Sequence, residues 1–318
     1  MKSSCLFKLP WIALAMAPLS AIAAVFPVPA APQSVIGEIQ YVQSSYEETL
    51  LDIGRRYGVG YEEMVAANPG VDPWLPGAGT RILIPSQFIL PDAPHEGIVV
   101  NLPEHRLYYY PKPRGDEPAT VVTYPVSVGK MDWKTPLGVT HVADKRVKPI
   151  WYPPESVLKE HAADGRPLAK AIPPGPDNPL GEFAMRLAVP GGAYLIHGTN
   201  LPAGVGMQVT HGCIRMFPED IEKFFPTVAV GTSVRILHQP YKMGWLKETL
   251  YMEVHTPLAG QEVENQGLTN ITRLLVAATR DRAVPIDWAG AERVFQKATG
   301  VPEPMFLVAT DARTSQPE

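Results

Sequence analysis

Two short apolar segments that each lead to a histidine constrain the fold of this chain most strongly. The first, residues 194–196, is β-prone and ends at His197, and the second, residues 207–210, leads to His211 and Cys213. A glycine follows each histidine, so we expect the backbone to turn there and both histidines to lie at strand ends. If the two strand ends lie side by side, His197 comes next to Cys213.

Such an arrangement suits a cysteine nucleophile, which needs a base within hydrogen-bond reach that a third group orients. Residues 217–225 place Pro218 near a first helical position with acids in the first turn, which predicts a helix start just after Cys213. The helix dipole and a neighbouring imidazolium would both favour the thiolate. The N–H groups of Gly212 and Cys213 are predicted to face a developing oxyanion.

The residues alone also permit two other interpretations. Cys213 could be a buried structural cysteine beside two histidines of the core. His197, His211 and Cys213 also have the ligand types of a zinc site, but a structural zinc needs a fourth ligand and the sequence offers none nearby. We therefore expect no metal.

A family resemblance follows from these motifs. The His-Gly-Thr-Asn box from His197 to Asn200, then Thr-His-Gly-Cys from Thr210 to Cys213 and Ile-Arg-Met, resembles the active-site signature of the L,D-transpeptidases, which remodel bacterial peptidoglycan. The resemblance implies that the cysteine is acylated by the diaminopimelate carbonyl of a tetrapeptide stem, that D-alanine leaves, and that an amine accepts the acyl group. It implies no cofactor.

The resemblance also assigns roles by position. Cys213 would be the nucleophile, His197 the general base, and the carbonyl of Gly198 would hold the imidazole tautomer. The oxyanion and substrate pocket would be shaped by His211, Gly212 and Arg215, with Tyr194, Asn200 and Thr210 as further substrate-binding residues. Thr210 stands where serine is commoner, and Arg215 where some branches have asparagine. Residues 134–138 and 178–181 resemble family landmarks too, so the likeness spans about 97–237.

Residues 1–23 have the pattern of a secretory signal peptide: Lys2 and Lys8, an apolar run, and Ala21-Ile22-Ala23 as a cleavage site. An uncleaved membrane anchor is the alternative, but the run is short and Pro18 interrupts it. Cleavage would remove Cys5 and leave Cys213 without a cysteine for an internal disulfide. A single thiol in the periplasm, the expected location, points to chemistry.

Residues 38–86 predict a small α+β unit with the order βααβ. A strand near 39–42 precedes a helix carrying Leu50, Ile53 and Tyr57, and a helix over 61–67 precedes a strand at 81–85. The succession resembles a LysM module, which binds glycans containing N-acetylglucosamine, although Glu47-Glu48 replaces the usual Gly-Asp. A packing module without a ligand is the alternative. The flanking residues 24–37 and 87–96 are predicted to be linkers.

Residues 97–239 predict a mainly β catalytic domain of antiparallel sheets with a few helices. The β-prone runs are 97–102, 106–110, 120–128 and 137–142. An insertion at 148–177, with a helix near 155–162, is expected to form a lid or substrate wall. Trp151 and Tyr152 could line the groove, but aromatics beside prolines favour packing.

Residues 240–318 predict a mixed C-terminal extension without a catalytic constellation. We expect a hairpin of 241–245 with 248–254, then helices near 269–279 and 287–299. Asp287 is a suitable N-cap and Gly300 a suitable stop. The polar tail from Arg313 is expected to fray.

Composition indicates a globular protein and excludes few functions. At 318 residues, 45% hydrophobic and 19% charged, the chain can bury a sizeable core, and its net charge of -4 gives no electrostatic reason to bind nucleic acid. We expect an exported peptidoglycan L,D-transpeptidase that transfers a tetrapeptide stem to a diaminopimelate amine or to an outer-membrane lipoprotein. An L,D-carboxypeptidase that resolves the acyl-enzyme with water is the close alternative. A papain-like endopeptidase is disfavoured because Cys213 follows His197, and an inactive glycan-binding wall protein is the alternative of another class.

Overall fold

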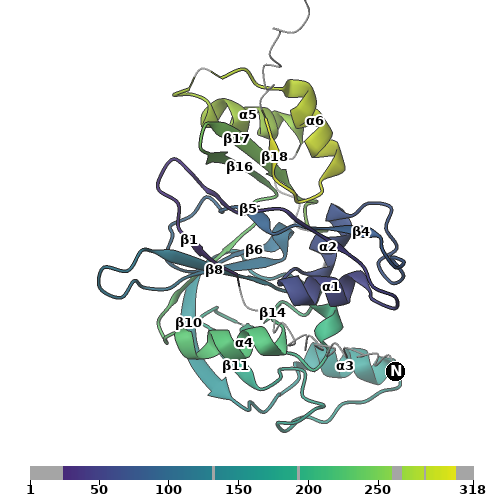
Figure 1. Cartoon of the computed structure of the whole chain (residues 1–318). Helices are drawn as coiled ribbons and strands as arrows, with labels where there is room; N and C mark the ends of the chain where they lie inside the picture. The colour runs from purple at the N-terminus through teal and green to yellow at the C-terminus, as the bar shows by residue number, and fades with distance from the viewer. Residues whose placement is uncertain (1–23, 131–132, 192–193, 260–266, 283, 306–318) are drawn as a thin grey trace, which may run out of the picture.

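A curled mixed sheet of nine strands forms the centre of the computed structural model, which describes residues 24–130, 133–191, 194–259, 267–282 and 284–305 (Figure 1). Its strand order is β1-β8-β7-β6-β15-β10-β11-β12-β14. In chain order these strands are β1 (Ala24–Pro27), β6 (Gly97–Asn101), β7 (Arg106–Tyr110), β8 (Thr120–Pro125), β10 (Gly138–Val147), β11 (Phe183–Leu187), β12 (Leu195–His197), β14 (Ile214–Arg215) and β15 (Ser233–Leu237).

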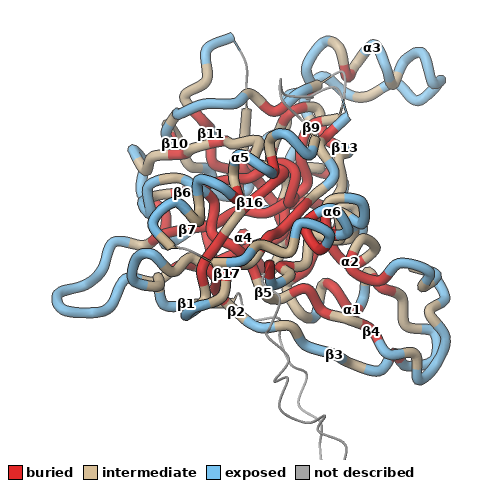
Figure 2. The backbone as a smooth tube through the Cα atoms, turned by 90° about the horizontal axis from the view of Figure 1, so that it is seen from above, coloured by how far each residue is buried: buried red, intermediate tan, exposed pale blue. Residues whose placement is uncertain are grey.

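The expectation of a largely antiparallel sheet is confirmed, with two parallel pairs that the sequence did not predict. Neighbouring hairpins such as β6 with β7 are antiparallel, but β15 pairs with β6, and β12 with β14, in parallel. The parallel partners are joined by long connections, which a parallel pair requires. β9 (Val128–Gly129) and β13 (Gln208–Thr210) form a separate small parallel pair. The apolar core, which includes Ile196 and Ile214, consists mostly of side chains of the central sheet, and the buried segments lie at the centre of the molecule in Figure 2.

The two predicted linkers are wrong, because both segments contain strands. β1 adds to the edge of the central sheet beside β8, and β2 (Val35–Gly37) pairs with β5 (Gln87–Ile89). An edge strand tolerates the prolines that made residues 24–37 look irregular. Ile36 and Phe88 of the β2-β5 pair bury their side chains against Tyr108 of the central sheet. These segments therefore attach their neighbours to the central sheet.

The predicted βααβ unit is present in residues 40–84. It consists of β3 (Gln40–Gln43), α1 (Leu50–Tyr57), α2 (Tyr61–Ala67) and β4 (Arg81–Ile84), with a core that includes Leu50 and Ile53. Thr49 caps α1 by accepting a hydrogen bond from the N–H of Asp52, and Gly58 ends the helix in the left-handed conformation at φ 66°. Local signals at both helix ends explain why the sequence predicted this unit well.

A buried ion pair joins this unit to the central sheet. Arg106 at the start of β7 is 1% exposed, and its Nε lies 2.7 Å from Oε1 of Glu63 in α2. The guanidinium also donates to the carbonyl of Gly58 at 3.2 Å and to the hydroxyl of Thr123 at 3.0 Å. Desolvation is the largest influence on the Glu63 carboxyl and raises its pKa, while Arg106 counteracts that effect.

The C-terminal residues form a small unit of three strands and two helices. The predicted hairpin is confirmed as β16 (Tyr241–Leu246) with β17 (Thr249–Val254), extended by β18 (Glu303–Pro304) and packed on α5 (Leu268–Ala278) and α6 (Trp288–Lys297). Asp287 caps α6 as predicted, accepting from the N–H of Gly290 at 2.8 Å. Ala298, at φ 45°, ends that helix two residues before the predicted stop at Gly300.

A buried ionic cluster fastens the C-terminal unit to the central sheet. Nζ of Lys242 lies 2.8 Å from a carboxylate oxygen of Glu104 and 2.7 Å from one of Glu253, and Nε2 of His255 lies 2.6 Å from Glu253. Glu104, Glu253 and His255 have metal-ligating atoms within 4.8 Å of one another. The ammonium of Lys242 supplies positive charge to both carboxylates there, so the cluster has an internal cation.

The remaining predictions concern the insertion and the termini. The insertion helix is confirmed as α3 (Glu155–Ala163), which extends from the body as a mostly exposed element (Figure 2). Trp151 forms a β-bridge with Ile172 within the insertion, and Tyr152 is 64% exposed. The predicted signal peptide and the tail from Arg313 lie outside the described residues. Within the described ranges, no helix combines the length and apolar character needed to cross a membrane.

Candidate active site

The predicted pairing of the two strands is wrong: residues 208–210 form β13, which pairs with β9, and the strand beside β12 is β14, which follows Cys213. Ile196 lies opposite Ile214, and His197 opposite Arg215. Side chains alternate along a strand, so His197, Arg215 and Cys213, one residue before β14, share one face while the two isoleucines enter the core on the other. Register therefore brings the imidazole and the thiol to the same surface of the sheet.

The imidazole of His197 has a fixed tautomer. Its Nδ1 lies 2.6 Å from the carbonyl oxygen of Gly198, which only accepts, so Nδ1 carries the proton and Nε2 has the lone pair. Burial, with the positive charge of Arg215, lowers the pKa of His197 to about 3, although the carbonyls of Gly198 and Leu180 act to raise it. His197 is therefore neutral at pH 7 and able to accept a proton.

The expectation of a thiolate-biased Cys213 is wrong for the protein without substrate. Burial raises the pKa of the thiol, and the opposing effects of the Leu195 backbone hydrogen bond and the Arg215 charge do not reverse it. A neutral His197 also removes the imidazolium that the prediction required. The resting pair is thus a thiol and an imidazole, so proton transfer has to accompany attack on a substrate.

The helix after the cysteine begins where the sequence predicted it, at Pro218. α4 (Pro218–Phe224) has proline in its first turn with Glu219 and Asp220, as expected, but β14 lies between it and Cys213. The effect of a helix dipole is confined to its first turn. Because Cys213 lies several residues before the first turn of α4, the helix dipole has little effect on the thiol, and burial is the main influence on its pKa.

Side chains from three segments stabilise the turn at Gly212, just before Cys213. Gly212 has φ +94°, and a Cβ placed on it would lie 2.8 Å from Cε1 of Tyr194. The hydroxyl of Thr210 donates to the carbonyl of Cys213 at 2.6 Å, and that of Thr135 donates to the carbonyl of Gly212 at 3.1 Å. Thr210 is only 2% exposed, so the prediction that it binds substrate is corrected to a role in the turn.

His211 faces the insertion. Its Nε2 lies 2.8 Å from Oε2 of Glu160 in α3, and its ring lies 5.2 Å from that of Trp133, centroid to centroid. Glu160 also accepts from Nζ of Lys130 at 3.0 Å, and the His211 and Lys130 hydrogen bonds lower its pKa to about 2. The second histidine is thus engaged by an exposed carboxylate.

Arg215 lies beside both reactive groups. Its positive charge acts to lower the pKa of both His197 and Cys213, although burial leaves the pKa of the thiol raised, and burial lowers the pKa of Arg215 itself. Nε of Arg215 is buried and has no hydrogen-bond partner among the described residues. A buried guanidinium nitrogen with an unused N–H beside a nucleophile is suited to a carboxylate of a substrate.

The comparisons with known proteins agree with this geometry. The family described as the L,D-transpeptidase catalytic domain, YkuD, matches residues 95–236. The probable L,D-transpeptidase YcfS of Escherichia coli K12 is 39% identical over 288 residues, 89% of each chain. The probable L,D-transpeptidases YbiS and ErfK/SrfK of the same strain are 37% and 36% identical, covering 89% and 91% of this chain and 92% and 93% of theirs.

The chain belongs to the L,D-transpeptidase family. It is therefore a cysteine-dependent acyltransferase of peptidoglycan, as the sequence motifs predicted.

Several residues around this L,D-transpeptidase site were not given roles from sequence. The carbonyl of Leu180 acts on His197, a backbone hydrogen bond of Leu195 acts on Cys213, and Thr135 and Glu160 hold the turn and His211. Leu180 and Thr135 lie in the two segments that resemble family landmarks, 178–181 and 134–138. That resemblance was the sequence feature from which their roles could have been predicted. Nothing local marks Glu160, because it reaches the site only through the tertiary fold.

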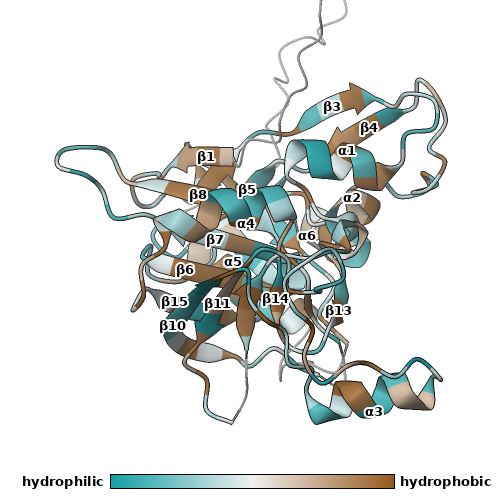
Figure 3. Ribbon diagram, turned by 90° about the horizontal axis from the view of Figure 1, so that it is seen from below, coloured by the Kyte–Doolittle hydropathy of each residue, from teal (hydrophilic) through white to brown (hydrophobic). Residues whose placement is uncertain are grey.

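The remaining predicted site residue, Asn200, is exposed at the edge of this L,D-transpeptidase site. Its Nδ2 donates to the carbonyl of Pro176 at 3.2 Å, which links the histidine box to the end of the insertion. Figure 3 shows α3 of the same insertion projecting from the sheet. The insertion therefore contacts both histidine segments, through Asn200 and through His211.

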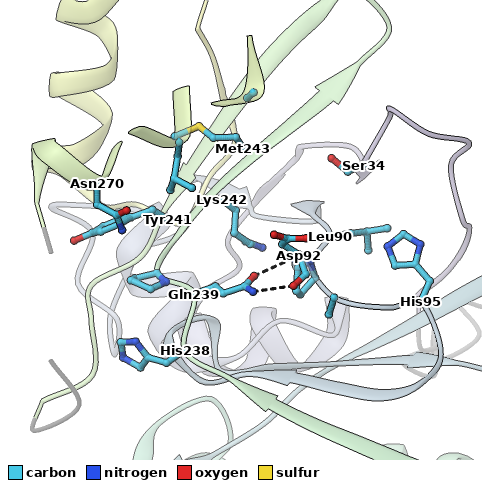
Figure 4. Close-up of a pocket in the computed structure, with 15 residues that line it drawn as sticks. Ser34, Leu90, Asp92, His95, His238, Gln239, Tyr241, Lys242, Met243 and Asn270 are labelled. Atoms are coloured by element: carbon cyan, nitrogen blue, oxygen red, sulfur yellow. Dashed lines mark hydrogen bonds between the residues drawn. The ribbon is translucent and has the colours of Figure 1, made fainter. Parts of the chain in front are cut away.

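One cavity of this L,D-transpeptidase lies away from Cys213. It measures about 480 Å³ and is formed by residues 90–95, 238–243 and parts of α5. Figure 4 shows Gln239 there, whose side chain accepts from the N–H of Asp92 at 2.9 Å and donates to its carbonyl at 3.0 Å. These bonds connect the start of the C-terminal unit to the segment before β6.

Proposed function

We propose that Cys213 is the nucleophile and His197 the general base of a peptidoglycan L,D-transpeptidase. His197 accepts the thiol proton on Nε2 while Sγ attacks the diaminopimelate carbonyl of a tetrapeptide stem. The backbone N–H groups of Gly212 and Cys213 stabilise the oxyanion. The proton on His197 passes to the amine of D-alanine as the peptide bond breaks, which leaves a thioester. The shared face of His197, Cys213 and Arg215 is the observation that carries this proposal.

The substrate is held by groups around that face. Arg215 binds a carboxylate of the stem with its guanidinium, whose buried Nε has no hydrogen-bond partner among the described residues. Tyr194 packs on the Gly212 turn and Asn200 lies at the rim, so both can contact a bound peptide. His211, held by Glu160 of the insertion, forms part of the substrate pocket.

The second half-reaction transfers the stem to an amine. His197 removes a proton from the attacking amine, which is the diaminopimelate side chain of a neighbouring stem or a lysine of an outer-membrane lipoprotein. Water in place of the amine would make the same acyl-enzyme an L,D-carboxypeptidase. Hydrolysis is the weaker candidate, because the family is named for transfer.

We further propose that the protein is exported to the periplasm and that residues 38–86 form a LysM domain that binds the glycan strand. The signal-like sequence of residues 1–23 supports export. The βααβ order of the unit supports the LysM assignment. Exposed rings such as Tyr46, at 82%, and Trp74, at 54%, offer amphipathic surfaces to a sugar chain.

Incubation of the purified protein with isolated sacculi tests this function. Mass spectrometry of the released muropeptides should show new dimers with a bond between two diaminopimelate residues, and loss of D-alanine from tetrapeptides. Cys213→Ala should give neither product. Tripeptides without dimers, even with a lipoprotein peptide added as acceptor, would assign the protein to hydrolysis.

A further inference from the structure

The start of helix α2 lies against the loop that connects the two histidine segments. The N–H of Tyr61 donates to the carbonyl of Val205 at 3.3 Å, and the N–H of Glu62 donates to that of Gly206 at 3.1 Å. The first N–H groups of a helix have no partner inside the helix. Here the loop supplies those partners, so the LysM-like unit and the loop complete each other's hydrogen bonding.

The two backbones touch through a pair of glycines. A Cβ placed on Gly206 would lie 2.4 Å from Cα of Gly60, and a Cβ placed on Gly60 would lie 2.7 Å from Cα of Gly206. Atoms that close cannot be accommodated without a shift of backbone. Only glycine at both positions allows the loop to approach α2 in this way.

The same loop continues to Arg215. The hydroxyl of Ser127 donates to the carbonyl of Gly204 at 2.7 Å, and the backbone of Ser127 exchanges two hydrogen bonds with that of Arg215, at 2.9 and 3.1 Å. A Cβ placed on Gly204 would lie 3.5 Å from Nη1 of Arg215. A displaced loop would therefore change the position of the guanidinium.

The other side of Gly60 is fixed to the central sheet. Its N–H donates to Oε2 of Glu63 at 2.7 Å, and Oε1 of the same carboxylate binds Arg106 in the buried ion pair. Gly60 thus cannot follow the loop if the loop moves. The contacts run from β7 through α2 to the loop and then to Arg215.

We propose that Gly60 and Gly206 are positioning residues for Arg215, and that the LysM-like unit is thereby one wall of the substrate site. The inference rests on the proposed binding of a stem carboxylate by Arg215. It replaces the simpler expectation that residues 38–86 act only as a tether, which would raise the local concentration of the glycan and leave turnover of a soluble stem unchanged.

Gly206→Ala tests the contact, with Gly70→Ala as its control. Gly206 has φ +84° and Gly70 φ +85°, so the backbone strain of alanine is matched, but nothing lies within 4 Å of a Cβ on Gly70. Gly206→Ala should raise KM for a soluble tetrapeptide roughly tenfold or more, since a misplacement of about 1 Å can cost up to a hundredfold. Labelling of Cys213 by iodoacetamide, which needs no carboxylate site, should change little. Gly70→Ala should behave as wild type.

A second pair of variants serves if Gly206→Ala does not fold. Tyr61→Pro removes the N–H that bonds to Val205 at a first helical position, where proline is tolerated, while Tyr61→Ala keeps that N–H and loses only the ring. The preceding Gly60 has φ −81° and ψ 168°, which a following proline accepts. Only Tyr61→Pro should raise KM.

Making Gly206→Ala in a protein that already carries Arg215→Lys tests whether the change in KM is caused by a displaced Arg215. If Gly206 acts through Arg215, Gly206→Ala should add little to the loss caused by Arg215→Lys, whereas independent effects would multiply. Multiplying effects, or an unchanged KM in both Gly206→Ala and Tyr61→Pro with an active wild type, would overturn the inference. An inactive wild type on the soluble stem would instead reject the proposed function.

Discussion

The two histidines of the Cys213 site belong to two different regions of the fold. On the core side, His197 at the end of β12 is 4% exposed and bonds to backbone carbonyls. On the insertion side, the imidazole of His211 bonds to the exposed carboxylate of Glu160 in α3. The carbonyl of Gly198 fixes the His197 tautomer that has its lone pair on Nε2. The ring of His211 instead bonds to a carboxylate through its Nε2. Both residues are histidines, so their different roles come from their positions in the fold: His197 is the proposed base, and His211 is part of the substrate pocket.

The ion pairs of the two regions differ in the same way. Arg106 and Glu63, which support the core side, have side chains 1% and 7% exposed. Lys130 and Glu160 on the insertion side are 36% and 42% exposed. Water screens the second pair and not the first. We therefore expect large effects from changes on the core side and small ones from changes on the insertion side.

His197→Ala should give the largest effect. Loss of a positioned base should slow acylation of Cys213 by a tetrapeptide by roughly two to four orders of magnitude. Intact mass of the acyl-enzyme, followed over time, measures the rate. His211→Ala, the matched control, should slow it far less, because that ring is held by Glu160. The opposite ranking of the two variants would move the base to the insertion side.

The sequence predicted most of the core side because its signals are local. Glycine after each histidine, the apolar β-prone run at 194–196, and the cap at Asp287 each act within a few residues, and each is in place. The motif resemblance then identified Cys213 and His197. Parallel register explains why they meet, and the sequence could propose that neighbourhood but not its register.

The sequence failed where burial and long-range contacts decide. The pKa of Cys213 depends on desolvation by the folded site, and residues 24–37 become strands only because β8 and β5 are available to pair with them. Glu160 lies 51 positions from His211 in the chain. No pattern of neighbouring residues contains such information.

Glu63→Gln should give the next largest effect, on stability. It leaves the guanidinium of Arg106 buried without its countercharge, which should lower the free energy of unfolding by about 3 kcal/mol. Urea unfolding at pH 7 measures the loss. Lys130→Gln, which breaks the exposed pair on the insertion side, is the control and should leave the urea midpoint close to that of wild type. Equal losses in the two variants would contradict the difference between the regions.

The pH dependence of Cys213 labelling tests whether burial on the core side raises the pKa of the thiol. Burial disfavours the charged thiolate, so the pKa of the thiol is raised and less thiolate is present at pH 7 than in an exposed cysteine. The iodoacetamide labelling rate should rise through alkaline pH with a midpoint above that of the same protein unfolded in urea. A plateau reached already at neutral pH would mean that the thiolate is paired with an imidazolium after all.

Glu160→Gln should give the smallest effect, on the insertion side. The amide keeps the size of the side chain but loses the charge that binds His211 at 2.8 Å and Lys130 at 3.0 Å. Because both contacts are exposed, turnover of a soluble tetrapeptide should fall only about two- to fivefold, through a looser wall rather than a weaker base. Steady-state kinetics with the tetrapeptide measure the change.

Glu155→Gln on the same helix is the matched control for Glu160→Gln. Glu155 is exposed and pairs with Lys159 in α3 without reaching His211, so its loss should leave kcat and KM unchanged. In the His211→Ala background, Glu160→Gln should have almost no further effect, because its partner is gone. A loss of the size expected for His197→Ala would show that Glu160 acts on the base, and the division between the core side and the insertion side would then be wrong.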